Sequence, residues 1–168
     1  MKSWDALKHE NPELAMIGRR LLFQSQPHVG FAFLATLRMD GAPRLHPVSI
    51  ILFNDHLYVM TPTTSPKCAD LLHDGRFAMQ AFPPPDNESY EEFYLSGCAV
   101  AIEDISKRQR LISDTQIRAG ENEALFELHL DRVMYTRLIN QGTLDEQPMH
   151  QKWHAEGTFE DHSKIPDG

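Results

Sequence analysis

The chain has 168 residues, a length that predicts one ordinary domain. Hydrophobic residues make up 41% of it and charged residues 24%, close to the globular average, which argues against a disordered or fibrous chain. The 24 acidic residues outnumber 16 lysines and arginines, and the resulting formal charge of −8 repels phosphate backbones. This balance argues against a general nucleic-acid-binding protein.

Cysteine usage and hydropathy narrow the class further. Cys68 and Cys98 belong to no CxxC pair, which argues against a disulfide framework or a structural zinc site. No apolar run approaches the roughly 18 residues that cross a bilayer. The first residues, Met1–Asn11, carry charges of both signs and lack the apolar segment of a secretory signal. We therefore expect a cytoplasmic protein that binds neither nucleic acid nor membrane.

The first half of the chain predicts one helix and an antiparallel meander. Apolar residues recur at helical spacing after Asn11, a plausible N-cap, and Pro12, which suits the first helical position. Strands are expected at residues 29–37, 44–53 and 56–61. The Asp40-Gly41 dipeptide is typical of a hairpin turn, and Asn54-Asp55 makes a second one. Two hairpins in succession favour a β-sheet over a βαβ unit.

The second half predicts three further strands and three helices. The strands are expected at residues 76–82, 93–102 and 131–139, and the helices at residues 67–73, 106–116 and 122–127. After Gly142 the chain becomes polar, so we divide it into a domain over residues 1–140 and a polar C-terminal arm over residues 141–168. Six short strands with helices at the connections predict a mainly β fold, a small β-barrel with peripheral helices.

One stretch has the chemistry of a phosphate site. Thr61–Ser65 contains four hydroxyl groups just before a predicted helix start, where backbone N–H groups and the helix dipole favour an anion. Lys67 lies in the first helical turn, and Arg44 on a neighbouring strand adds a cation with forked geometry. The alternative is that Ser65 only caps the helix and Lys67 is solvated.

Several short motifs follow one another in a recognisable order. They are Asp40-Gly41-x-Pro43-Arg44, Leu57–Thr61, Ser65-x-Lys67, Leu71-Leu72 and Asp74–Phe77, and later Leu95–Ala99 and Phe126–Val133. In this order the chain resembles the FMN-binding split β-barrel family, the flavoproteins related to pyridoxamine 5′-phosphate oxidase. The resemblance covers residues 12–140. It implies a six-stranded antiparallel split β-barrel of the Greek-key type with peripheral helices.

The resemblance also implies a cofactor and a partner. FMN would lie at the interface of a homodimer, with its phosphate held by Arg44, Ser65 and Lys67. The strand residues 45–48 would lie along the isoalloxazine ring, and residues 60–61 would contact the ring or the ribityl chain. The complete implied set of cofactor-binding residues is Arg44, Leu45, His46, Pro47, Val48, Met60, Thr61, Ser65, Pro66 and Lys67.

Two departures separate the chain from the oxidase that gives the family its name. Pro66 stands where that enzyme has a basic residue, and Trp153 and Gly157 are followed by no Arg-x-His-x-Arg segment. We therefore expect an FMN-binding oxidoreductase that is not a true pyridoxamine phosphate oxidase. It would pass electrons from a reduced nicotinamide to a small-molecule acceptor, and no residue stands out as a catalytic acid or base.

Two alternatives stay open. One is a deazaflavin-dependent reductase, for which Arg76 is the obvious additional cation. The other is a stress-response protein that binds flavin or haem without turnover, with His46 or the histidines of the C-terminal arm as haem ligands. A metal site is not predicted, because His150 and His154 have the spacing of two ligands on a helix face but no third ligand can be named.

Overall fold

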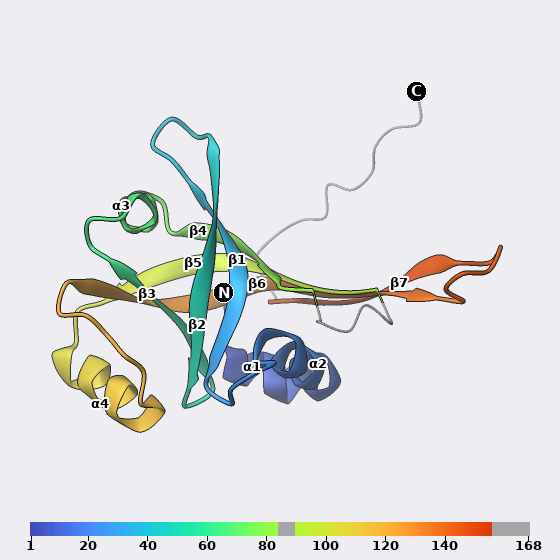
Figure 1. Ribbon diagram of the computed structural model, residues 1–168, viewed down its shortest axis with the longest axis horizontal. Coiled ribbons are helices and arrows are strands. Elements are labelled where there is room, and N and C mark those ends of the chain that lie inside the picture. Colours follow the sequence, from blue (N-terminus) through green and yellow to red (C-terminus); the bar gives the residue numbers. More distant parts are fainter. Residues whose placement is uncertain (84–89, 156–168) are drawn as a thin grey trace.

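The structure is a computed structural model that describes residues 1–83 and 90–155 (Figure 1). Its elements are α1 (Trp4–Glu10), α2 (Pro12–Leu22), β1 (Val29–Leu37), β2 (Pro43–Phe53), β3 (His56–Pro62), α3 (Pro66–His73), β4 (Arg76–Ala81), β5 (Glu91–Ile102), α4 (Ile105–Thr115), β6 (Glu123–Ile139) and β7 (Gln147–His154). The helices α1 and α2 lie side by side against the barrel. The helix α4 lies apart from them, on another side of the barrel (Figure 1).

Six of the strands close a barrel. Their order in the sheet is β3-β2-β1-β4-β5-β6, all pairs are antiparallel, and β3 also pairs with β6, which joins the two ends. Because β4 returns to lie beside β1 after the β1–β2–β3 meander, the connection is a Greek key. The expected six-stranded antiparallel barrel is confirmed. The seventh strand, β7, is an addition that pairs with β6 outside the ring.

Local signals placed the first elements correctly. Asn11 caps α2, its side chain accepting a hydrogen bond from the Leu14 backbone N–H at 3.1 Å, and Pro12 is the first helical residue. Gly41 has a φ of 79°, the left-handed conformation that the β1–β2 turn requires. The helix α1 was not expected from the sequence.

Two expectations for the second half are wrong. The helix expected at residues 122–127 is absent, because this stretch is the start of β6. The segment pairs with β3 and with β5, and this pairing outweighs its local preference. His150 and His154 lie on β7, within the segment expected as a polar arm, so they do not share a helix face.

A small second core holds α4 against the outside of the barrel. It contains the buried side chains of Ile51, Tyr58, Leu111 and Leu125, separate from the main core inside the barrel. Leu111 is the buried residue of α4. Ile112 of α4 packs against the same core, and polar contacts add to these apolar ones.

An ionic cluster around Glu127 on β6 supplies those contacts. Glu127 is 6% exposed, and its carboxylate accepts hydrogen bonds from Lys107 Nζ at 2.7 Å and from His56 Nδ1 at 2.6 Å. The Lys107 ammonium also lies 5.4 Å from the centre of the Tyr58 ring. Burial raises the pKa of Glu127, but the hydrogen bonds from Lys107 and His56 outweigh it, so the pKa lies below its ordinary value.

Glu127 should stabilise the fold at neutral pH and lose this effect in acid. Its folded-state pKa is lowered, so its contribution is complete above the ordinary value of 4.5 and disappears as the pH falls through the folded value. We expect Glu127→Gln to cost about 1 kcal/mol at pH 7, a modest figure because Lys107 and His56 stay partly solvated. Urea unfolding at a series of pH values should show that the free energies of unfolding of the variant and the unaltered protein converge below the ordinary pKa of glutamate.

The exposed Glu103, which precedes α4, provides the matched control. The free energy of unfolding of Glu103→Gln should equal that of the unaltered protein at every pH. A stability difference for Glu127→Gln that stays constant into acid would contradict the assignment.

Candidate cofactor-binding site

The strands β2 and β3 separate halfway along their length. Within the described residues they pair only over Ile50–Phe53 of β2, whereas β3 pairs with β6 from Leu57 to its end at Pro62. β2 meanwhile continues along β1 as far as Pro43. The backbone groups of residues 43–49 that face away from β1 therefore have no strand partner there. An unpaired strand edge offers hydrogen-bonding groups to a ligand.

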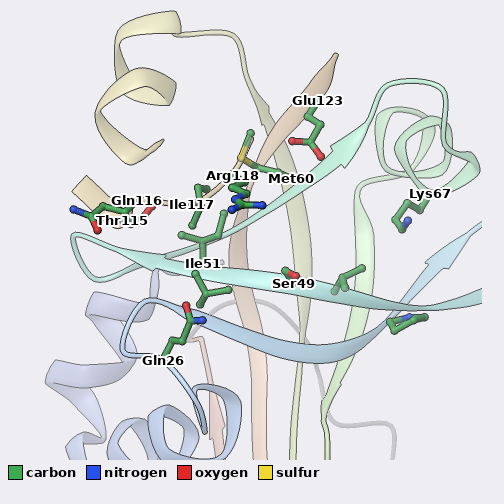
Figure 2. Close-up of a pocket in the computed structure, with 13 residues that line it drawn as sticks. Gln26, Ser49, Ile51, Met60, Lys67, Thr115, Gln116, Ile117, Arg118 and Glu123 are labelled. Atoms are coloured by element: carbon green, nitrogen blue, oxygen red, sulfur yellow. The ribbon is translucent and has the colours of Figure 1, made fainter. Parts of the chain in front are cut away.

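A pocket of about 470 Å³ opens where the two strands separate (Figure 2). A volume of this size suits a small molecule or a cofactor. The lining residues come from β2 and β3, the first residues of β1 and β6, the start of α3, the end of α4 and neighbouring loops: Gln26, Val29, Pro47, Val48, Ser49, Ile51, Met60, Lys67, Thr115, Gln116, Ile117, Arg118 and Glu123. Four of the expected cofactor residues are among them, namely Pro47, Val48, Met60 and Lys67.

Lys67 brings a positive charge to the pocket at the N-terminus of α3. It is half-buried, and within the described residues it makes no ion pair. Ser65 caps the helix by accepting from the Cys68 N–H at 3.3 Å, and Pro66 is the first helical residue. The Ser65 hydroxyl also bonds that of buried Thr61 at 2.7 Å. A cation in a first helical turn opposes the helix dipole, so an anion beside it is favoured.

Arg44 lies outside the lining and is held by Asp70 of α3. Its Nε donates to Asp70 Oδ2 at 2.8 Å, and the Thr36 hydroxyl donates to the same oxygen at 2.8 Å. Asp70 is 5% exposed, so Arg44 neutralises a buried carboxylate. The terminal guanidinium nitrogens of Arg44 have no hydrogen-bond partner in the described part of the chain.

His46 lies near these charges with a nitrogen that is not satisfied. Alternation along β2 places it on the same face as Arg44 and Val48. Its Nε2 is buried and has no hydrogen-bond partner among residues 1–83 and 90–155. Burial lowers the pKa of His46, and the charges of Lys67 and Arg44 lower it further, so the ring is neutral at neutral pH. A neutral imidazole in this position is suited to bind a polar group of a ligand.

Leu45 does not line the pocket. It is 65% exposed on the face of β2 that continues onto β1, where Phe31 is 49% exposed. Phe82 packs against Phe31 and against Phe33, with ring centres 6.4 Å and 4.4 Å apart. We call Phe31, Phe33, Leu45 and Phe82 the outer apolar face. Partly exposed apolar side chains on one face of a sheet are typical of an interaction site.

Sequence reasoning missed the second wall of the pocket. This wall consists of Thr115–Arg118, at the end of α4, and of Glu123. Gln116 ends α4 in the left-handed conformation, with a φ of 54°. Glu123 reaches the pocket because β6 pairs it with Pro62 of β3. Because the sequence predicts a helix at residues 122–127, it gives no indication of that strand pairing.

No metal centre emerges from the described part of the chain. There, no three His, Cys, Asp or Glu side chains are grouped so that they could hold a metal ion. His150 Nδ1 bonds the Thr136 hydroxyl at 2.9 Å.

Cys68 and Cys98 are free thiols, and burial raises the pKa of each. None of the helices described here is long and apolar enough to cross a membrane.

Comparisons with known proteins identify the fold. No family model matches the chain, and no curated protein matches it. HupZ of Group A Streptococcus has a TM-score of 0.57 at 18% identity, over 70% of this chain and 90% of that one. A heme binding protein from Mycobacterium smegmatis has a TM-score of 0.55 at 17% identity, over 78% of this chain and 55% of that one. An F420 reductase has a TM-score of 0.50 at 17% identity, over 67% of this chain and 93% of that one.

This chain spans about half the length of the M. smegmatis protein. At such low identities the likeness concerns the fold alone. The strand order and these neighbours together give the chain the split β-barrel fold.

Proposed function

We propose that the chain binds FMN in the pocket between β2 and β3 and acts as an FMN-dependent oxidoreductase. The observation that carries the proposal is Lys67, a cation without an ion-pair partner among the described residues, at the start of α3 on the wall of a pocket of about 470 Å³. Lys67 and the N–H groups of α3 would hold the phosphate, and the free guanidinium nitrogens of Arg44 would assist. Bound FMN would supply the transfer of electrons from a reduced nicotinamide to a small acceptor.

The residues of β2 and β3 fit a flavin ring as well as a phosphate. The unpaired edge of residues 45–48 would provide backbone hydrogen bonds, and His46 Nε2 would gain the partner that it lacks. Val48 and Met60 would provide apolar contacts to the ring. Thr61 and Ser65 would act indirectly, because their mutual hydrogen bond fixes the start of α3.

The visible absorption spectrum of the purified protein tests this proposal. We expect the two bands of an oxidised flavin, or their recovery when FMN is added, with inorganic phosphate competing for the site. Oxidation of a reduced nicotinamide by the FMN-loaded protein would then separate an enzyme from a carrier. A colourless protein whose FMN titration produces no change would defeat the cofactor assignment.

Two neighbours favour the alternative cofactors, since one is named an F420 reductase and another a heme binding protein. A deazaflavin with a longer acidic tail needs cations besides Lys67. Arg76 is committed to Asp74 at 2.6 Å, an interaction that lowers the pKa of Asp74 to about 2, whereas Arg118 lines the pocket. For haem, the unpartnered Nε2 of His46 is the available ligand. Flavin, deazaflavin and haem are distinguished by the same spectrum.

We further propose that the outer apolar face joins two copies of the chain in a homodimer. Leu45→Glu would place a charge in that interface, and burying an unpaired charge is costly. We expect light scattering to report twice the chain mass for the unaltered protein and a single chain mass for Leu45→Glu. Met39→Glu is the matched control, since Met39 is exposed in the turn after β1 and should leave the mass unchanged. A dimeric Leu45→Glu variant would contradict this interface.

A further inference from the structure

The pocket carries a second cation, Arg118, which the binding of the flavin phosphate by Lys67 does not account for. Lys67 approaches from α3, and Arg118 approaches from the opposite side, after the end of α4 (Figure 2). The left-handed residue Gln116 turns the chain back, and Ile117 then packs against the second core. Ile117 therefore fixes the loop, and the loop determines where Arg118 can reach.

Two charged groups near Arg118 are already engaged by the backbone of Gly120. Arg108 donates to the Gly120 carbonyl at 2.7 Å, and Glu123 Oε2 accepts from the Gly120 N–H at 2.8 Å. Arg118 has neither a carboxylate nor a hydrogen-bond partner within the described residues, although Glu123 lines the same pocket. Arg118 is thus a free guanidinium on the wall of a site, next to the apolar side chains of Ile51 and Met60.

A guanidinium group binds a carboxylate or a phosphate through two parallel hydrogen bonds. We propose that Arg118 binds an anionic group of the second substrate, the molecule that exchanges electrons with the cofactor, and makes the pocket selective for substrates with a carboxylate or phosphate beside an apolar body. This inference rests on the proposed function, because only an oxidoreductase has the second substrate to which it refers. The anion preference itself belongs to Arg118 and can be measured separately.

Calorimetric titration with three aromatic probes tests the inference. Benzoate carries a carboxylate, phenyl phosphate carries a phosphate, and benzamide is the neutral counterpart. The titrations are made on the FMN-saturated protein and repeated without FMN. We expect at least one anion to bind about tenfold more tightly than benzamide, and Arg118→Gln to remove that advantage. The anion that binds more tightly identifies the substrate group.

Matched variants separate recognition from structure. Arg118→Lys should retain part of the preference, because it keeps the charge and loses the fork. Arg110→Gln, on α4 beside a different pocket, should leave the affinity for the three probes unchanged. The FMN dissociation constant of Arg110→Gln should equal that of the unaltered protein.

Three results overturn the inference: benzamide binding as tightly as both anions, equal anion affinities in Arg118→Gln and Arg110→Gln, or absence of any anion binding. Failure of FMN to bind defeats the proposed function instead, and the titrations without FMN then still decide whether Arg118 selects anions.

Discussion

Replacing Lys67 with glutamine should weaken FMN binding by about 2 kcal/mol, or roughly thirtyfold. Lys67 has no carboxylate partner in the described part of the chain, so its charge is available to a phosphate. Glutamine keeps much of the side-chain length and removes the charge. The stability of the protein without FMN should hardly change, because Lys67 makes no ion pair that the substitution would break.

Quenching of FMN fluorescence on binding provides the measurement. Arg19→Gln is the control, since Arg19 is an exposed cation near the end of α2 that does not line the pocket. Arg44→Gln should behave differently from Lys67→Gln, because it leaves the buried carboxylate of Asp70 without its ion pair and destabilises the fold. Equal FMN affinities in Lys67→Gln and the unaltered protein would exclude Lys67 as the phosphate ligand.

Gly97→Ala should be the most destabilising of the substitutions considered, at about 3 kcal/mol or more. Gly97 lies on β5 at a register shift in the pairing with β6. A Cβ atom there would lie 1.8 Å from the His129 carbonyl oxygen and 3.0 Å from the Leu130 Cα. Both contacts are backbone atoms of the neighbouring strand, so the clash can be relieved only by pushing the two strands apart.

Urea unfolding at neutral pH measures this effect. Gly120→Ala is the matched control, because the same methyl group there meets only the Glu123 side chain, at ordinary contact distances of 3.7–3.8 Å. We expect Gly120→Ala to stay within about 0.5 kcal/mol of the unaltered protein. A similarly small change for Gly97→Ala would show that the strands tolerate displacement at the bulge.

The elements that the sequence predicted well are those with local causes. The cap at Asn11 and the turn at Gly41 depend on neighbours within a few residues. The stretch 122–127 contains Glu, Ala and Leu, which favour helices, and its strand partners lie far away in the chain. Single-sequence reasoning weighs the first fact and cannot see the second.

The same division applies to the candidate site. The helix start at Ser65–Lys67 is a local motif, and Lys67 does line the pocket. The pairing of Arg44 with Asp70 depends on α3 packing against β1, where Thr36 shares the carboxylate. Arg118 reaches the pocket only because α4 and its following turn fold back toward β2 and β3. Contacts of this kind exist only in three dimensions.

The pairing of β3 with β6 has a consequence for how the protein folds. The hairpins β1–β2 and β2–β3 join neighbours in the sequence and can form early, whereas Leu57 meets Leu128 only after a long loop has closed. The pocket takes its walls from both sides of this closure. A ligand therefore has no complete site to bind until the ring of strands is joined, so it holds the finished barrel together without guiding its assembly.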